Sequence, residues 1–309
     1  MILLTGSSGF IGKAIFKYLV DSGVSFKSLS RKANQYTVKE NTHYCIEMNG
    51  SSDFSGILYD VDTVIHAAGK AHRPAGDAQE QYIKVNLDST LNLARQSAAS
   101  GVKRFIFIST ININGSFGNS YFTEADTPAP YDFTAKLKLE AENGLWLIQQ
   151  ETKMEVVIIR SPLVYGPNAP GNFGRLVHWL DKGVPLPLGI VHNKRSLIAL
   201  ANLVDVIILC VSHPAAANEM FLVADGEDIS TSDLLRGVAK AMGKPLCLLP
   251  VPVCLLLVVA SILGKKTLAH SLLGSLQVDT SKARSLLGWE PPLSVERGLA
   301  RCFEKGDKK

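Results

Sequence analysis

Three glycines near the start of the chain restrict its fold more than any other feature of the sequence. They lie in the run Thr5-Gly6-Ser7-Ser8-Gly9-Phe10-Ile11-Gly12, between an apolar stretch at residues 2–4 and a helix-like segment. Glycine lets a backbone turn tightly and approach a pyrophosphate, whose charge is stabilised at the positive N-terminal end of a helix. The run therefore predicts a dinucleotide-binding turn between a strand and a helix, although three glycines can also form only a tight turn. The candidate cofactor-binding residues of this turn are Gly6, Ser8, Gly9, Phe10, Ile11 and Gly12.

Short apolar runs alternate with helix-like segments in the first half of the chain. The runs are residues 2–4, 25–29, 63–66, 104–108 and 155–159. This alternation is typical of parallel strands joined by crossover helices, so we expect an α/β fold with a Rossmann-type, doubly wound parallel sheet. Farther on, proline- and glycine-rich loops surround a strand-like run at 220–223 and helical segments at 231–242 and 281–287. We predict a dinucleotide-binding domain over residues 1–160, with later segments interleaved, and a smaller substrate-binding lobe mainly over residues 161–309.

Charge and histidine spacing exclude two classes of ligand. The net charge of +4 comes from 32 basic and 28 acidic residues, and the only dense basic run is residues 305–309. We therefore expect no nucleic-acid partner. The histidines at positions 66, 72, 178 and 192 are too scattered for a metal site, so we expect no metal.

The cysteines and the longest apolar stretch indicate the compartment. Five cysteines, at positions 45, 210, 247, 254 and 302, are odd in number and far apart, which favours a reducing environment. The apolar run at residues 2–4 leaves no room for an export signal, so we expect a cytoplasmic protein. Residues 251–263 are thirteen residues without a charge, whereas a transmembrane helix needs about twenty. We expect no transmembrane segment there, but either a core helix or a surface that docks on a membrane or a partner enzyme.

The end of the second predicted strand is the usual place where NAD and NADP are discriminated. An acidic side chain there accepts a hydrogen bond from the free ribose hydroxyl of NAD. The sequence instead has Ser30-Arg31-Lys32, and a guanidinium beside an ammonium pairs well with a 2′-phosphate. We therefore predict NADP, with Ser30, Arg31 and Lys32 as contacts and NAD as the alternative. A solvated basic turn is the other interpretation of these residues.

Further motifs, in a fixed order along most of the chain, resemble those of one superfamily. They are His66-Ala67-Ala68-Gly69, the segment from Val85-Asn86-Leu87 to Asn92-Leu93, Val164-Tyr165-Gly166-Pro167 and Leu286-Leu287-Gly288-Trp289-Glu290-Pro291. With the G-x-x-G-x-x-G spacing, they are similar to the extended short-chain dehydrogenases/reductases, the NAD-dependent epimerase/dehydratase superfamily. One departure is Asp88-Ser89, which replaces "x-G" of the family pattern. The resemblance implies cofactor contacts at Ala67, Ala68, Gly69, Asn86 and Pro162.

Within this superfamily, the chain is similar to bacterial UDP-N-acetylquinovosamine dehydrogenases and UDP-glucose 4-epimerase-like proteins of surface-polysaccharide pathways. The likeness runs through residues 171–173, 185–189, 195–197 and 202–205. It implies that Asn172, Leu188 and Arg195 surround the diphosphate and uridine of a UDP-sugar, and an arginine holds a diphosphate well. The alternative for Arg195 is a structural pair with Asp205. The superfamily also implies a homodimer, through helices near residues 87–99 and 138–149.

The family reaction is hydride transfer at a sugar carbon, assisted by a tyrosine, a lysine and a serine or threonine. The tyrosine exchanges the alcohol proton, and the lysine lowers its pKa from about 10 toward neutrality. Thr110 matches the hydroxyl donor. With the chain aligned on Glu140-Ala141-Glu142, Lys138 takes the lysine position, which also contacts the cofactor. Thr134 then stands at the tyrosine position and Leu137 at a serine position, so the predicted catalytic residues are Thr110, Thr134 and Lys138.

The missing tyrosine leaves the chemistry open. Threonine is a far weaker acid than a phenol, and loss of a general acid typically slows a reaction about 10²–10⁴-fold. On a continuous helix Tyr131 lies about 140° from Lys136 and roughly 10 Å along the axis from Lys138. It can replace the missing group only if the chain before the helix bends back. The chain is then a slow enzyme, an enzyme that uses a substrate group or water, or a binding protein without turnover.

Three functions are consistent with these residues. The first is an NADP-dependent oxidoreductase at carbon 4 of a UDP-linked 6-deoxy-N-acetylhexosamine, that is, a 4-keto sugar reductase or dehydrogenase of surface-polysaccharide synthesis. Arg31 favours this function, because its guanidinium suits the 2′-phosphate of NADPH and a reductase draws on exchangeable NADPH. The second is a UDP-sugar 4-epimerase, which regenerates its own cofactor and usually holds NAD tightly. The third, favoured by Thr134 and Leu137, is a catalytically impaired protein that binds NADP or a nucleotide sugar.

Overall fold

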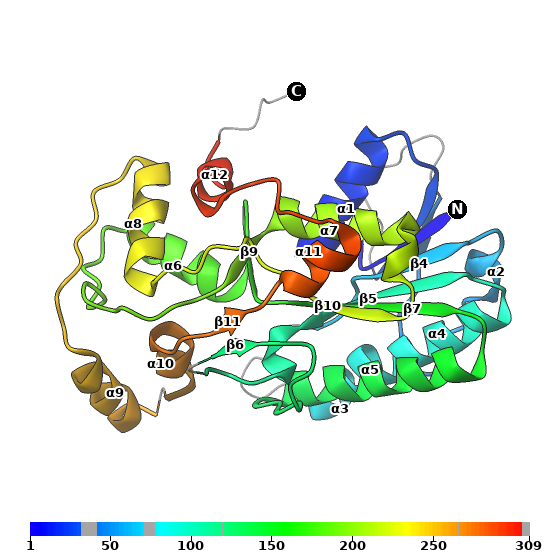
Figure 1. The fold of residues 1–309 in the computed structure, drawn as a ribbon, viewed down its shortest axis with the longest axis horizontal. Coiled ribbons are helices and arrows are strands. Elements are labelled where there is room, and N and C mark those ends of the chain that lie inside the picture. The colour runs from blue at the N-terminus through cyan, green and yellow to red at the C-terminus, as the bar shows by residue number, and fades with distance from the viewer. Residues whose placement is uncertain (32–41, 71–77, 119, 265, 305–309) are drawn as a thin grey trace.

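A seven-stranded parallel sheet forms the centre of the molecule, shown by a computed structural model (Figure 1). The structure describes residues 1–31, 42–70, 78–118, 120–264 and 266–304. The strands of the sheet are β1 (Ile2–Thr5), β2 (Phe26–Ser30), β3 (His43–Cys45), β4 (Thr63–His66), β5 (Arg104–Thr110), β7 (Glu155–Ser161) and β10 (Glu219–Leu222). Their order in space is β10-β7-β5-β4-β1-β2-β3, and each pair is parallel. This confirms the expected α/β fold.

The strand order reverses between β1 and β4. From β1 the chain builds outward through β2 to β3, and it then returns to β4 and builds in the other direction. In an open parallel sheet, such a reversal leaves a crevice at the carboxyl ends of the strands, where ligands bind. Thr5 and His66 are paired at these carboxyl ends. The glycine turn and the His66-Ala67-Ala68-Gly69 segment therefore meet at the crevice.

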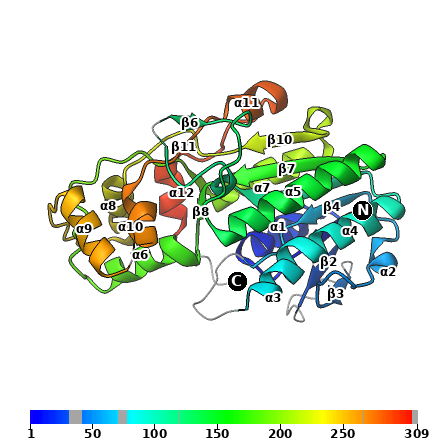
Figure 2. The same ribbon diagram turned by 90° about the horizontal axis from the view of Figure 1, so that it is seen from below.

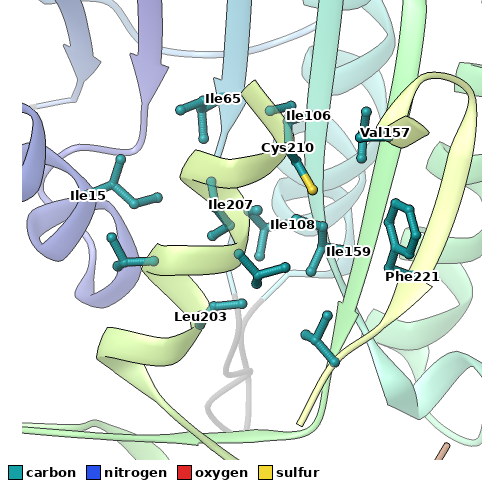
Figure 3. Packing of buried hydrophobic residues seen from close by; sticks show 14 of the residues in the cluster. Ile15, Ile65, Ile106, Ile108, Val157, Ile159, Leu203, Ile207, Cys210 and Phe221 are labelled. Atoms are coloured by element: carbon teal, nitrogen blue, oxygen red, sulfur yellow. The ribbon is translucent and has the colours of Figure 1, made fainter. Parts of the chain in front are cut away.

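Helices cover both faces of the sheet, because its strands are apolar on both sides (Figure 2). The helices α1 (Phe10–Asp21), α7 (Leu200–Ser212) and α11 (Ser281–Leu287) cover one face, and α2 (Ser55–Leu58), α4 (Ser89–Ala99) and α5 (Phe133–Glu151) cover the other. Figure 3 shows Leu203 and Ile207 of α7 packed against Ile108 of β5. Short helical segments complete this part: α3 (Gln79–Ile83), a π-helical turn (Lys84–Asp88) and 3₁₀ turns (Ile111–Ile113 and Pro214–Ala216).

A smaller lobe lies beside the sheet and has its own apolar core (Figure 1). Its elements are α6 (Gly171–Asp181), α8 (Thr231–Met242), α9 (Val253–Ile262), α10 (Lys266–Leu273), α12 (Val295–Arg301), and the strand pairs β8 (Leu163–Tyr165) with β9 (Leu197–Ala199) and β6 (Tyr121–Phe122) with β11 (Gln277–Val278). Later segments return to the sheet, since β10 pairs with β7 and α11 covers one face. The division at residue 160 stays a prediction. Among the described residues, no helix is long and apolar enough to cross a membrane.

Candidate active site

The glycine turn lies directly against the loop that follows β4. Gly6 has a φ of 72°, in the left-handed region that glycine adopts readily. A Cβ at this position would lie 2.6 Å from the backbone nitrogen of Ala68. The two loops can therefore approach each other only because residue 6 has no side chain. Helix α1 begins at Phe10, so its N-terminal end faces the crevice.

A cavity of about 760 Å³ opens from this turn along the ends of β1, β2 and β3. Of the residues expected to bind the cofactor, its lining includes Gly6, Ser8, Gly9, Ser30, Arg31, Ala67, Ala68 and Gly69. Arg31 is exposed to this cavity, whereas Lys32 lies outside the described residues. Two carboxylates, Glu47 and Asp88, also line it. Backbone amides, a guanidinium and hydrogen-bond acceptors are the groups that hold the phosphates and sugar hydroxyls of a nucleotide.

Gly12 does not line either of the two cavities at the crevice but packs α1 against the turn. A Cβ on residue 12 would lie 2.0 Å from the carbonyl oxygen of Gly6. This contact explains the third glycine, because any side chain would push the helix away from the turn.

Gly12→Ala is expected to lower the free energy of unfolding by about 1–3 kcal/mol, the usual cost of overpacking, and to weaken dinucleotide binding as the turn shifts. Urea unfolding and dinucleotide titration measure the two effects. The control is Gly56→Ala in α2, where a Cβ would meet no atom within 4 Å. Equal stability of the two variants would show that the contact with Gly6 does not matter.

Asn86 is a positioning residue rather than part of the cavity wall. Its side chain is buried, with 1% exposed. The Oδ1 atom accepts a hydrogen bond from the backbone nitrogen of Lys70 at 2.8 Å, and Nδ2 donates to the Lys70 carbonyl at 3.0 Å. Both bonds fix the end of the loop at residues 67–70, which lines both cavities.

A second cavity, of about 370 Å³, adjoins the first along that loop. Of the predicted site residues, its lining includes Phe10, Ile11, Ala67, Ala68, Gly69, Thr110, Thr134, Lys138, Pro162, Asn172 and Arg195. The central sheet, helix α5 and the smaller lobe all contribute residues to this cavity. The structure therefore brings the predicted catalytic residues together with two of the three residues predicted to bind the substrate, although their roles stay predictions.

Lys138 lies deep in the second cavity. Its Nζ donates a hydrogen bond to the carbonyl of Ile108 at 2.8 Å and lies 4.1 Å from the centroid of the Phe107 ring. Burial lowers the pKa of Lys138 to about 8, although the Glu142 carboxylate acts in the opposite direction. The ammonium therefore predominates below about pH 8 and provides a positive charge in the wall of the second cavity, which Thr110 and Gly69 also line.

Thr134 stands in the first turn of α5, one helical turn before Lys138. Both line the second cavity, whereas Leu137 is buried away from it. Tyr131 precedes the helix, because the Asp132 side chain caps it by accepting from the backbone nitrogen of Ala135 at 2.7 Å. Tyr131 also lines the cavity. Its position relative to Lys136 and Lys138 therefore cannot be calculated as if all three residues stood on one continuous helix. Burial and the Asp132 carboxylate raise the pKa of Tyr131, which makes it a poor source of phenolate near neutral pH.

Arg195 enters the same cavity from the lobe. Its Nη1 donates to the carbonyl of Gly274 at 3.1 Å, and burial lowers its pKa. The alternative pairing with Asp205 is wrong, because no ion pair among the described residues joins Arg195 to Asp205, whose carboxylate accepts from Trp289 Nε1 at 2.9 Å. Leu188, in contrast, is buried in the lobe core and lies outside this cavity. The structure does not bring its side chain together with Asn172 and Arg195.

A buried polar network supports the catalytic side of the cavity. Arg160 on β7 donates to Glu142 on α5, with Nε 3.1 Å from Oε1, and also to Asn114 Oδ1 at 2.8 Å. Ser109 on β5 donates to the same Glu142 carboxylate. Glu142 and Arg160 are 1% and 3% exposed. The network therefore ties α5 to β5 and β7 within two residues of Thr110.

Several cavity residues had no sequence signal. Helix α10 contributes Ser271 and Leu272 to the second cavity, Leu276 lines it just before β11, and no motif marks these residues. Lys70 does follow a motif directly and could have been proposed from it. His66 makes hydrogen bonds to Thr5 and Thr90, and burial lowers its pKa to about 3, so it is neutral. In the described ranges, no group of three or more His, Cys, Asp or Glu could hold a metal ion.

Comparisons with known proteins place this architecture in a family. Residues 2–224 match the model of the NAD dependent epimerase/dehydratase family. The UDP-glucose 4-epimerase of Vibrio cholerae is 41% identical over 98% of this chain and 94% of its own. The N-acetyl-α-D-glucosaminyl-diphospho-ditrans,octacis-undecaprenol 4-epimerase of Escherichia coli O157:H7 is 26% identical over the same shares, 98% and 94%.

A solved structure shows the same fold. The crystal structure of UDP-glucuronic acid 4-epimerase from Bacillus cereus, in complex with UDP-glucuronic acid and NAD, superimposes with a TM-score of 0.79. The match covers 98% of this chain and 97% of that chain at 20% identity. At this identity, the likeness supports the fold alone.

Proposed function

The chain belongs to the NAD dependent epimerase/dehydratase family, and from this membership we propose that it transfers a hydride at carbon 4 of a UDP-linked sugar. The specific reaction we propose is NADP-dependent reduction of a UDP-linked 4-keto-6-deoxy-N-acetylhexosamine, or its reverse, in surface-polysaccharide synthesis. The V. cholerae and E. coli relatives are 4-epimerases of sugars, and the family that matches is the NAD dependent epimerase/dehydratase family. These names support a nicotinamide dinucleotide and a sugar nucleotide as ligands.

The observation that carries the proposal is the continuity of the two cavities. They share the loop at residues 67–70, with Arg31 in the first cavity and Lys138 in the second. A dinucleotide needs such an extended site, with its phosphates at the glycine turn between them. The second cavity also holds Arg195, whose guanidinium suits the diphosphate of a sugar nucleotide.

Each residue has a defined task in this reaction. The bound dinucleotide supplies or accepts the hydride, and the sugar oxygen gains or loses a proton. In this chain Thr110 holds that oxygen by a hydrogen bond, and the Lys138 ammonium stabilises negative charge on it. Thr134 stands where a stronger acid is expected, so proton transfer is the slow step.

A UDP-sugar 4-epimerase is the second candidate. The V. cholerae relative supports it, and so does Glu47, because a carboxylate in the first cavity suits the free ribose hydroxyl of NAD better than a 2′-phosphate. A protein that binds both ligands without turnover is the third candidate, supported by Thr134. The homodimer and the cytoplasmic location remain part of the proposal as predictions from the sequence.

Arg31→Ala is expected to weaken NADPH binding about 10–100-fold, as loss of a hydrogen bond to a charged group typically costs about 1.5–3 kcal/mol. NADH binding should change little, because NADH has no 2′-phosphate. Fluorescence titration of both cofactors measures the effect, with the exposed Lys17→Ala on α1 as the control. Tighter binding of NAD than NADP by the wild type would overturn the NADP assignment and favour the epimerase. A protein that binds neither dinucleotide nor any UDP-sugar would contradict the whole proposal.

A further inference from the structure

Helix α9 exposes an apolar face that nothing in the described structure covers. None of its residues is buried, and its sequence, VCLLLVVASI, holds no charged or aromatic side chain. Leu255, Val258 and Ile262 are 52%, 55% and 79% exposed. Their spacing of three and four residues places them on one side of the helix. We call these three residues the outer face of α9.

The opposite side of α9 is anchored to the lobe. Leu256 and Val253 pack against the lobe core, and an apolar cavity of about 370 Å³ lies between α9, α10 and the loop at residues 184–188. Leu272 of α10 lines both this cavity and the second cavity of the active site. The helix is therefore a fixed part of the lobe, attached through α10 to the wall of the site.

The position of α9 leaves its outer face accessible. In both views the helix lies at the opposite end of the molecule from α2 (Figures 1 and 2). The stretch of sequence around it, residues 234–278, contains five Lys or Arg and no Asp or Glu. Three of these cations, Arg236, Lys240 and Lys244, pair with carboxylates from outside the stretch. The remaining two, at positions 265 and 266, stand three and four residues after the end of α9 in the sequence.

The outer face alone is too small to form a stable interface with a second copy of the chain. A ten-residue helix is about 15 Å long and about 10 Å wide, so one side offers on the order of 150 Å², far below the ~800 Å² per partner of a stable interface. The helix also lacks the Trp, Tyr and Arg residues that anchor protein interfaces. An apolar face close in the sequence to the lysines at positions 265 and 266 instead matches an anionic bilayer, whose interface accepts shallow apolar insertions next to basic residues.

We propose that the outer face of α9 inserts into the interface of an anionic phospholipid bilayer and docks the protein there without crossing it. The inference goes beyond the proposed reaction and does not depend on it. The docked orientation brings the lobe side of the second cavity toward the lipid surface, because α10 connects the two.

The test is flotation of the purified full chain with vesicles of phosphatidylglycerol and phosphatidylcholine, and with vesicles of phosphatidylcholine alone. We expect binding to the anionic vesicles that falls at high salt, and at least a tenfold loss in the double variant Val258→Glu, Ile262→Glu. The control is Tyr59→Glu, which places one negative charge, against two in the double variant, at a residue that is 73% exposed at the other end of the molecule. Turnover of a soluble UDP-sugar should be equal in all three proteins, so loss of docking is separable from loss of the reaction.

Three results would overturn the inference. The first is that the wild type does not float with anionic vesicles, and the second is that the double variant floats as well as the wild type. The third is that light scattering finds a dimer for the wild type and a monomer for the double variant. The last result would show that the outer face of α9 contacts a second copy of the chain and not a bilayer. Circular dichroism of the variants checks that a loss of flotation is not a loss of folding.

Discussion

Thr134→Tyr is expected to raise the rate of NADPH oxidation with a UDP-linked 4-keto sugar about 10²–10⁴-fold, the usual contribution of a positioned general acid. The substitution places a phenol one helical turn before Lys138, in the wall of the second cavity. The Lys138 ammonium, whose own pKa burial lowers to about 8, favours the phenolate and brings the tyrosine nearer to neutral pH. The measurement is the nicotinamide absorbance under saturating substrate.

The control for this gain is Thr134→Phe, which has the same ring and no hydroxyl. We expect no acceleration from phenylalanine, because packing alone moves no proton. A wild type that already turns over fast, and does not gain from tyrosine, would contradict an impaired site and rule out the binding-only function. Tyr131→Phe then asks whether the phenol that precedes α5 provides the proton instead; a large loss of rate would assign that role to Tyr131.

Glu142→Ala is expected to lower the free energy of unfolding by about 3–5 kcal/mol, because it leaves a buried arginine without its counter-charge. Arg160 is only 3% exposed, and Ser109 loses its acceptor at the same time. Urea unfolding followed by circular dichroism measures the loss. The catalytic rate should fall as well, since the network holds β5 one residue from Thr110.

Two variants keep this prediction testable. Glu142→Gln retains an acceptor of the same shape and should cost less than alanine, which gives a measurable protein if Glu142→Ala does not fold. Asp21→Ala removes the carboxylate of the exposed Lys17–Asp21 pair, and an exposed pair of this kind contributes at most about 1 kcal/mol. A loss of less than 1 kcal/mol in Glu142→Ala would show that water or a neighbouring group replaces the carboxylate.

Most of the sheet could be predicted from the sequence, because strands buried on both faces are continuous apolar runs. The expected run at 63–66 is β4, and the expected helices at 231–242 and 281–287 are α8 and α11. The short strand β3 was not foreseen. It has three residues, none buried, so its position depends on pairing with β2 and not on its own hydrophobicity.

The candidate site could be predicted only in part from the sequence. Residues that follow strands, such as Thr110 and the loop at 67–70, could be placed because parallel strands end at one edge of the sheet. The start of α5 could not be fixed, since it depends on the Asp132 cap, and the position of Tyr131 follows from it. Contributions from α10 depend on how the lobe packs, which no local pattern encodes.

The late arrival of β10 has a consequence for biosynthesis. Until residues 219–222 leave the ribosome, β7 has an unpaired outer edge, and until residues 200–212 leave it, that face of the sheet also lacks the cover of α7. Such an edge is a template for pairing with other nascent chains. The nucleotide half therefore cannot mature ahead of the remainder, and a fragment cut near residue 160 would be released as an aggregation-prone intermediate.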